Sequence, residues 1–300
     1  MTIESHVAVL VAETMERLRA ERGGLLVDGT VGAGGHAAAW LERGGARARV
    51  LGFDRDRAML DRAAARLDAA GDPRVELVHA SYEEAPAVLD ARGLRADAIL
   101  IDAGAASVHF DDAARGFSLE RDGPLDMRFD PSAGGLTAEE IVRDWPEEEL
   151  ARIFREHGEE RRPHAVARKI VEARRLGPIR TTTHLAEIVA RATTGGRIHP
   201  ATRVFQALRI ATNDELGHLE RALEALPDRL VPGGRIAVIA FHSLESRIVK
   251  VAFRRAREEG RLTIVTRRAV RASEREVREN ARSRSAQLRV AERPGEESGE

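Results

Sequence analysis

The segment VDGTVGAGGHA combines glycines and a carboxylate in a pattern that favours a bound cofactor. It follows a short apolar run and opens a helical pattern, so its glycines would let the backbone approach a ligand at the start of a helix. Residues 32–37 also satisfy the loose dinucleotide-binding pattern G-x-G-x-x-G/A, and Asp54 follows at the expected distance of about 20 residues. This pattern by itself fits either NAD or S-adenosylmethionine.

Asp28 favours S-adenosylmethionine over a dinucleotide. It stands at the end of the predicted strand, immediately before the glycines. A carboxylate there would repel a pyrophosphate, whereas it would attract the cationic amino group of a methionine moiety. The later part of the chain also lacks a second mononucleotide-binding half. We therefore expect Asp28 and Gly32 to contact S-adenosylmethionine.

Three further side chains lie where such a cofactor would extend. Asp54 ends the second predicted strand and is placed to accept hydrogen bonds from both ribose hydroxyls. Tyr82, just after the third strand, is placed to pack beside the adenine, with a core tyrosine as the alternative. Asp102 follows the apolar run AILI and would lie at the carboxyl edge of the sheet, where open α/β sheets bind ligands.

Strands alternate with helices over the first hundred residues. The apolar runs 25–30, 48–54, 74–81 and 96–104 are predicted strands, with helices between them. This alternation predicts an α/β fold with a doubly wound, mostly parallel sheet. After one long helix over 205–226, later strands are expected at 229–243, 261–268 and 285–293.

The alternation stops in the middle of the chain. Amphipathic helical patterns without a convincing strand run from about Phe117 to Gly195. We therefore expect a discontinuous main domain, 1–114 and 205–300, interrupted by an all-helical substrate-recognition domain over 115–204. Arg121 and Arg128, in a loop at the edge of the insert, are predicted RNA contacts. The last seven residues, PGEESGE, are predicted to be a frayed end.

The basic residues are nearly all arginine. Lys169 and Lys250 are the only lysines among 48 basic residues, and thirteen arginines face six glutamates between positions 254 and 293. Arginine forms bidentate bonds to phosphate, so this local excess favours RNA binding, and we expect Arg282 and Arg284 to contribute. A GC-rich coding bias combined with a solvated helix face is the alternative explanation.

The order of these motifs resembles the bacterial 16S ribosomal RNA cytosine-N4 methyltransferase family over nearly the whole chain. The resemblance is carried by VDGTVGAGGH, GFDRD, RGFSLERDGPLDMR, HPATRVFQALRI and PGGRIAVIAFHS, two of which are long and idiosyncratic strings. It implies a class I, Rossmann-like methyltransferase with S-adenosylmethionine as donor. It also implies a decoding-site cytosine of the small ribosomal subunit as substrate. The cofactor contacts that it implies are Gly34, Gly35, His36, Asp54, Tyr82, Asp102 and His109.

Some positions depart from the family pattern. Where the family usually reads D-L-G-V-S-S-P-Q, this chain reads DAGAASVH from Asp102 to His109. Histidine donates a hydrogen bond as glutamine does, so the cofactor contact at His109 is retained as an expectation. In HSLES, Ser246 replaces an acid. None of these changes removes Asp102 or the glycine loop.

Methyl transfer from a sulfonium mainly requires in-line positioning of the nucleophile. A cytosine amine is a poor nucleophile because its lone pair is delocalised, so an acceptor for an amine proton would favour the reactive geometry. We expect the loop from Asp102 to Ser107 to supply this acceptor, with His242 and Ser243 as secondary candidates. A structural histidine is the alternative for His242. The chain lacks the S/D/N-P-P-Y/F/W motif of DNA amino-methyltransferases, so the cytosine-N4 assignment rests on the resemblance.

Composition narrows the remaining choices. The chain has no cysteine, and HPATR offers a single histidine, so no metal site is expected. Neither a signal peptide nor a membrane-spanning run is found, which predicts a cytoplasmic protein without a membrane partner. An NAD-dependent oxidoreductase and a non-catalytic RNA-binding ribosome-assembly factor are the alternatives. The sequence leaves the oligomeric state open, a homodimer included.

Overall fold

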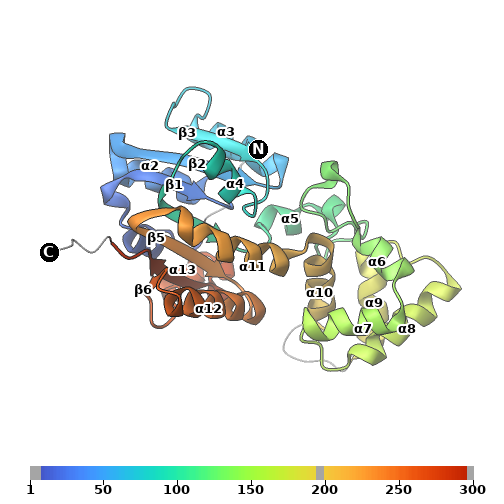
Figure 1. Cartoon of the computed structure of the whole chain (residues 1–300). Helices are drawn as coiled ribbons and strands as arrows, with labels where there is room; N and C mark the ends of the chain where they lie inside the picture. The colour runs from blue at the N-terminus through green and yellow to red at the C-terminus, as the bar shows by residue number, and fades with distance from the viewer. Residues whose placement is uncertain (1–7, 194–198, 296–300) are drawn as a thin grey trace. The chain divides into compact units, whose positions relative to one another are not determined.

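A computed structural model describes residues 8–193 and 199–295, which divide into two compact units (Figure 1). One unit is built from the chain up to Gly104 and from Leu216 onward, and the other spans Ala105–Glu215. The helical unit therefore begins at 105 rather than at the predicted 115, and ends at 215 rather than 204. The C-terminal boundary moves because Phe205 and Leu208 belong to the apolar core of the helical unit.

The first unit contains, among its described residues, a seven-stranded sheet in the order β3-β2-β1-β4-β5-β7-β6. The strands up to β5 are parallel to their neighbours, and β7 pairs antiparallel with both β5 and β6. The strands are β1 (Gly24–Asp28), β2 (Ala48–Asp54), β3 (Val75–His79), β4 (Ala96–Asp102), β5 (Leu230–Ala240), β6 (Thr263–Ile264) and β7 (Gln287–Glu292). The doubly wound, mostly parallel sheet expected from the sequence is confirmed.

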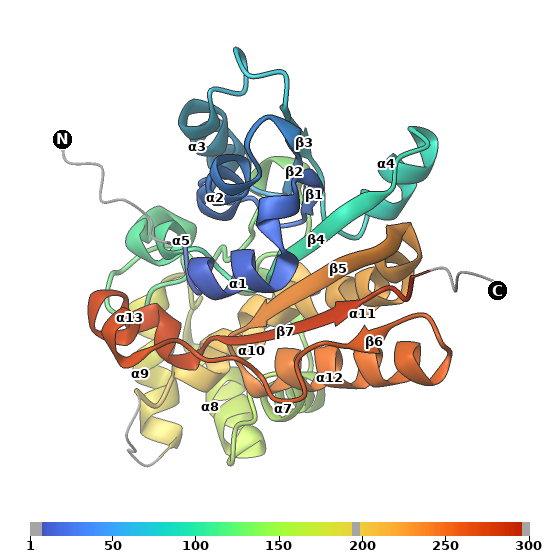
Figure 2. The same ribbon diagram turned by 90° about the vertical axis from the view of Figure 1, so that its left-hand side faces the viewer.

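Helices cover both faces of the sheet (Figure 2), because the strands carry apolar side chains on both faces. In β4, Ala98 and Leu100 pack with α1 (Val11–Leu18), α2 (Gly35–Gly44) and α3 (Arg57–Leu67). Ile99 and Ile101 face the opposite core, with α4 (Ala85–Ala91), α11 (Glu215–Ala225) and α12 (Ser243–Glu258). This alternation fixes the register that brings the carboxyl ends of β1 and β4 together.

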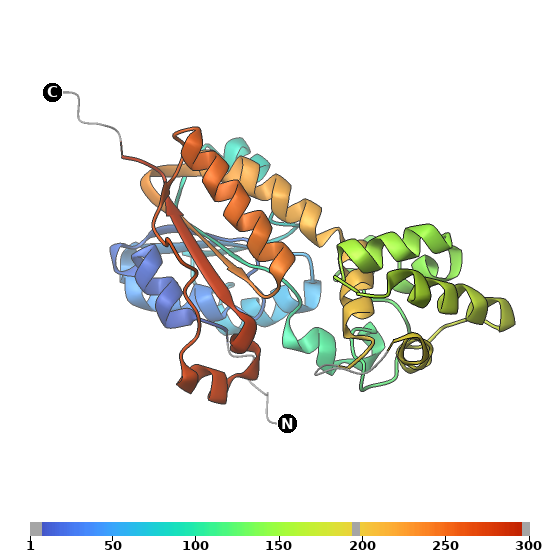
Figure 3. The same ribbon diagram turned by 90° about the horizontal axis from the view of Figure 1, so that it is seen from below.

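The C-terminal strands differ from expectation. The predicted strand 261–268 is reduced to the two residues of β6, and β7 lies between β5 and β6. Figure 3 shows α12, in orange, lying along this part of the sheet, with β7 in red. The helices α1 and α13 (Glu274–Glu279) were not predicted, since each offers fewer than three turns of pattern.

The second unit is helical in its described part, apart from one isolated bridge between Pro124 and Thr181. Its helices are α5 (Ser107–Asp111), α6 (Ala138–Asp144), α7 (Glu147–Glu156), α8 (Pro163–Leu176), α9 (Thr182–Ala192) and α10 (Thr202–Asn213). Thr137 and Glu140 form a capping box that starts α6, and the Thr181 hydroxyl caps α9.

One predicted helix, 205–226, is in fact two. The helix is interrupted at Asp214, which lies between α10 and α11 and adopts a left-handed conformation with φ of 48°. Periodicity alone misses this break because Asp tolerates the left-handed region and leaves the apolar pattern intact. The division coincides with the boundary between the two units.

Within the described ranges, no helix is long and apolar enough to cross a membrane. The predicted frayed end lies, from position 296 onward, outside the described residues.

Candidate cofactor site and active site

Asp28 ends β1 with a buried carboxyl group that is only half satisfied. Its Oδ1 accepts a hydrogen bond from the Thr30 N–H at 3.2 Å, whereas Oδ2 has no hydrogen-bond partner in the described part of the chain. The residue is 1% exposed. Burial raises the pKa of Asp28 to about 7, against the lowering effect of the Thr30 bond, and nearby Asp54 raises it further. An unpaired carboxyl of this kind suits a cationic ligand.

The glycines after Asp28 shape the turn between β1 and α2. Gly32 and Gly34 have φ of 53° and 79°, in the left-handed region that favours glycine. A Cβ atom on Gly34 would stand 3.1 Å from Leu67 Cγ. The loop is held in place because the Gly32 N–H donates to Asp54 Oδ2 at 2.9 Å. Gly35 is the first residue of α2, so the loop leads directly into a helix N-terminus.

Asp54 joins this loop from the end of β2. Its Oδ2 accepts from Gly32, and its Oδ1 accepts from the Asp56 N–H at 2.8 Å. Burial raises the pKa of Asp54 to about 6, although these backbone bonds oppose the shift. A third backbone N–H group, that of Arg55, also bonds to this carboxylate, and its contact with ribose hydroxyls stays a prediction.

Two predicted cofactor residues have clear partners within the protein. His36 is 4% exposed, and its Nε2 donates to the Val9 carbonyl at 3.0 Å. It therefore ties α2 to the segment before α1. Tyr82 is half-buried, and its Cβ would come within 2.7 Å of a Cβ placed on Gly29, so it packs directly against the start of the glycine loop.

Asp102 ends β4 beside Asp28. Its N–H donates to the Thr30 hydroxyl at 2.6 Å, and its buried Oδ1 makes no hydrogen bond with the described residues. Burial raises the pKa of Asp102 to about 8, Arg282 lowers it, and Asp28 and Glu245 raise it. The site therefore gathers several carboxyl groups around Asp102. Sequence reasoning missed Glu245 and assigned Arg282 to RNA.

His242 lies in the turn from β5 into α12, where Glu245 fixes its position by hydrogen bonds. Glu245 is 2% exposed, and its Oε2 accepts from the N–H groups of Phe241 at 2.7 Å and His242 at 3.2 Å. His242 is the N-cap of α12, and its Nδ1 accepts from the Glu245 N–H at 3.4 Å. Its Nε2 lies 3.0 Å from Glu245 Oε1 without hydrogen-bond alignment. This geometry favours the structural alternative for His242.

The remaining catalytic candidates lie at helix starts. Ser243 is the exposed first residue of α12, and Ser107 is the first residue of α5 in the helical unit. Their catalytic roles stay predictions. Ser246, which replaces an acid of the family pattern, donates to Gln287 Oε1 at 3.0 Å and so links α12 to β7.

His109 belongs to the helical unit and is buried in an aromatic cluster. Its Nδ1 accepts from the Ala106 N–H at 3.0 Å, and its ring lies 5.2 Å from Phe117 and 5.0 Å from Phe129 between centroids. The side chain thus caps the start of α5. Its predicted contact with the cofactor stays a prediction.

Arg121 and Arg128 are also engaged within the helical unit. Arg128 pairs with Asp126 through two hydrogen bonds, at 2.9 and 2.6 Å. Arg121 donates to the Asp111 carbonyl. Charge reversal at these positions would disturb the fold of the unit, so neither residue gives a clean test of RNA binding.

The site residues fit S-adenosylmethionine better than a dinucleotide. Asp28 Oδ2 and Asp102 Oδ1 are buried acceptors without hydrogen bonds in the described residues, next to a glycine turn that admits a ligand closely. A cationic ligand would compensate these groups, whereas a pyrophosphate would face several carboxyl groups. A sheet that adds an antiparallel β7 between β5 and β6, with this site at its carboxyl edge, defines a class I methyltransferase.

The chain belongs to the MraW methylase family, whose sequence model matches residues 4–294. It is 47% identical to ribosomal RNA small subunit methyltransferase H of Solidesulfovibrio magneticus, over 96% of this chain and 95% of that protein. It is 48% identical to the protein of the same name from Symbiobacterium thermophilum, over 95% of each chain. The resemblance seen in the sequence motifs is confirmed, and the protein is a methyltransferase.

Proposed function

We propose that the protein transfers a methyl group from S-adenosylmethionine to the N4 atom of a decoding-site cytosine in small-subunit ribosomal RNA. The observation that carries the proposal is the pair of acids Asp28 and Asp102 at adjoining strand ends beside the glycine turn, each with a buried oxygen that forms no hydrogen bond with the described residues. The names of the relatives support the substrate class. The cofactor supplies an activated methyl group on a positively charged sulfur.

The residues of the first unit divide the work of binding the cofactor. Asp28 pairs with its amino group, Asp54 accepts hydrogen bonds from its ribose, and Tyr82 packs beside its adenine. The turn through Gly32 and Gly34 leaves room for the ligand at the N-terminus of α2. His36 stabilises the start of α2 from the protein side through its bond to Val9.

Asp102 orients the nucleophile and takes up its proton. A cation bound beside Asp28 and Asp102 lowers the pKa of both acids, so Asp102 is a carboxylate when the cofactor is bound. The carboxylate then accepts a hydrogen bond from the cytosine amine and holds its lone pair in the reactive direction. Glu245 and Arg282 set the charge around Asp102. The helical unit recognises the RNA.

Tritium transfer tests the proposal directly. Small ribosomal subunits from a strain that lacks this modification are incubated with the protein and methyl-labelled cofactor, and the label is located by nuclease digestion. We expect N4-methylcytidine with the wild-type protein. Asp102→Asn keeps the shape of the side chain, and we expect it to lower kcat by about a hundredfold or more.

The alternatives predict other outcomes. A non-catalytic assembly factor would bind the subunits without labelling them, and label on another base or atom would overturn the cytosine-N4 assignment. An oxidoreductase would show a melting shift with NAD and none with S-adenosylmethionine.

A further inference from the structure

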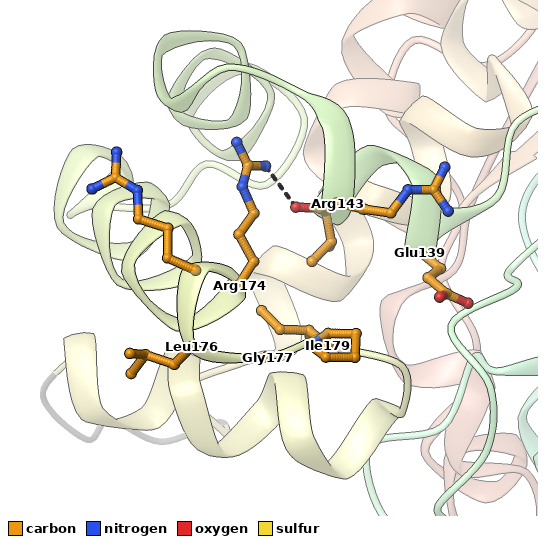
Figure 4. A pocket seen from close by; sticks show the side chains of 9 residues that line it. Glu139, Arg143, Arg174, Leu176, Gly177 and Ile179 are labelled. Carbon is orange, nitrogen blue, oxygen red and sulfur yellow. Dashed lines mark hydrogen bonds between the residues drawn. The ribbon is translucent and has the colours of Figure 1, made fainter.

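The helical unit contains a basic pocket between α6 and the end of α8 (Figure 4). Its volume is about 490 Å³, within the range of small-ligand sites. The lining includes the arginines Arg143, Arg174 and Arg175 and one acid, Glu139, and Arg143 is itself paired with Asp144. We call this site the arginine pocket.

The walls of the arginine pocket are fixed by hydrogen bonds. Arg174 Nη1 donates to the carbonyls of Val142 and Trp145, each at 2.8 Å, so the guanidinium is held across the end of α6. The lining segment after α8 is anchored where the Leu125 N–H donates to the Arg180 carbonyl at 3.1 Å. A ligand would therefore meet a fixed backbone and a fixed Arg174, and its binding would have to order only the exposed side chains of Arg175 and Leu176.

Arg174 and Arg175 keep hydrogen-bond donors that no described residue uses, although their charges also lower the pKa values of Asp144 and Glu172. Among the described residues, Arg174 uses Nη1 alone, and exposed Arg175 forms no ion pair. On the same helix, Lys169 pairs with Glu172 three residues further on, as exposed helix charges commonly do, and Arg168 pairs with Glu147 of α7. A guanidinium with unused donors suits the oxygens of a phosphate group.

An exposed apolar residue stands beside these charges. Leu176 ends α8 and is 92% exposed, whereas the neighbouring lining residues Val142 and Ile179 are buried. Basic residues in the last turn complement the helix dipole, and this alone would account for Arg174 and Arg175. The helix dipole does not explain why an exposed leucine lines the same pocket. A nucleotide offers both a phosphate and an apolar face.

We propose that the arginine pocket binds one nucleotide of the RNA substrate, with its phosphate on Arg174 and Arg175 and its nucleoside against Leu176. The inference rests on the proposed function, because it takes RNA as the substrate of this chain. It assigns a second contact for the RNA strand, apart from the cytosine that is methylated.

Two variants separate the two halves of the contact. Arg175→Ala should raise KM for small ribosomal subunits by about tenfold and flatten the salt dependence of binding by about 0.7 log units per log unit of salt, as for one phosphate contact on a single strand. Leu176→Ser should weaken binding severalfold and leave the salt slope unchanged. Neither should change kcat or the affinity for S-adenosylmethionine. Arg191→Ala, an equal charge change at an exposed site on α9, is the control.

Filter binding to subunits gives a readout that is independent of methylation. If the wild type binds subunits without methylating them, the proposed function fails. The role of the arginine pocket is then still tested by comparing the affinities of the wild type and the variants for subunits. If Arg175→Ala and Leu176→Ser both match Arg191→Ala, the inference is overturned. Free cytidine monophosphate is a second probe: tight binding to it that depends on Arg175, with unchanged RNA affinity, would also overturn the RNA assignment.

Discussion

Asp28 and Asp102 are acids that the fold keeps out of water without giving them full hydrogen bonding. Burial raises their pKa values to about 7 and about 8, from an ordinary value of 3.8. The folded protein without cofactor therefore holds protons that the unfolded chain releases at lower pH. Such a cost is typical of a functional site, since a structural acid would be paired or replaced.

The free energy of unfolding of the cofactor-free protein should fall as pH rises from about 4 to about 8. The unfolded chain binds fewer protons than the folded protein over this window, so the slope of stability against pH is negative. Urea unfolding at several pH values measures it. Asp28→Asn and Asp102→Asn should each flatten the slope, and saturating S-adenosylmethionine should do the same, because its charge lowers both pKa values.

A stability that rises with pH through this window in the wild type, or Asn variants with the wild-type slope, would contradict the raised pKa values. Asp72, a half-buried acid whose pKa is lowered by Arg74, provides the control, since Asp72→Asn should not flatten the slope above pH 5.

At the scale of elements, the helical unit depends on one buried amide at the end of α10. Asn213 is 3% exposed. Its Oδ1 accepts from the Phe129 N–H at 2.8 Å, and its Nδ2 donates to the carbonyls of Met127 at 2.7 Å and Arg209 at 2.9 Å. Met127 has a φ of 61°, so this side chain holds a strained turn that carries Phe129 into the aromatic cluster.

Asn213→Ala should destabilise the protein by about 2–4 kcal/mol, because it leaves a buried N–H and a buried carbonyl without partners. Asn213→Asp should cost at least as much, since a carboxylate oxygen would replace the Nδ2 donor opposite two carbonyls. Chemical denaturation measures both. Thr137→Ala, which removes the half-buried N-cap of α6, should cost about 1 kcal/mol and serves as the reference for a single lost hydrogen bond. An Asp variant as stable as wild type would show that Nδ2 is not needed.

At the scale of the whole molecule, the arginine-rich segment from 254 to 293 does not act as one basic tail. Arg255 and Arg261 both pair with Glu224 of α11 and with Glu259, the residue after α12. Arg275 and Arg278 pair with glutamates of α13. Arg282 lies close enough to Asp102 to lower its pKa. If this segment binds RNA phosphates, as the sequence predicts, exposed residues such as Arg284 would make the contacts.

Arg282→Gln should move the acidic limb of the pH–rate profile to higher pH, because loss of the positive charge raises the pKa of Asp102. Arg282→Lys keeps the charge and should restore most of the wild-type profile. The salt slope of RNA binding should stay as in wild type for both variants. A flattened slope with an unmoved pH profile would return Arg282 to the RNA-binding role expected from the sequence.

The sequence by itself determined the class of fold and the places of the predicted cofactor residues. Buried parallel strands read as continuous apolar runs, and ligand-binding residues of such sheets follow those runs directly. Asp28, Asp54 and Asp102 were therefore found at three strand ends, and they lie at strand ends in the structure. The family followed from motif order, and the relatives confirm it.

Only the tertiary structure decided which distant residues complete the site and how its charges are balanced. Glu245 and Arg282 reach Asp102 because β5 and β7 pair antiparallel beside β4, and pairing between strands far apart in the chain has no local signature. The interior place of β7 was hidden for the same reason, whereas the break at Asp214 was hidden because it leaves the apolar pattern intact. The periodicity of a sequence shows which face of a helix or strand is apolar, whereas the tertiary structure determines which element packs against that face.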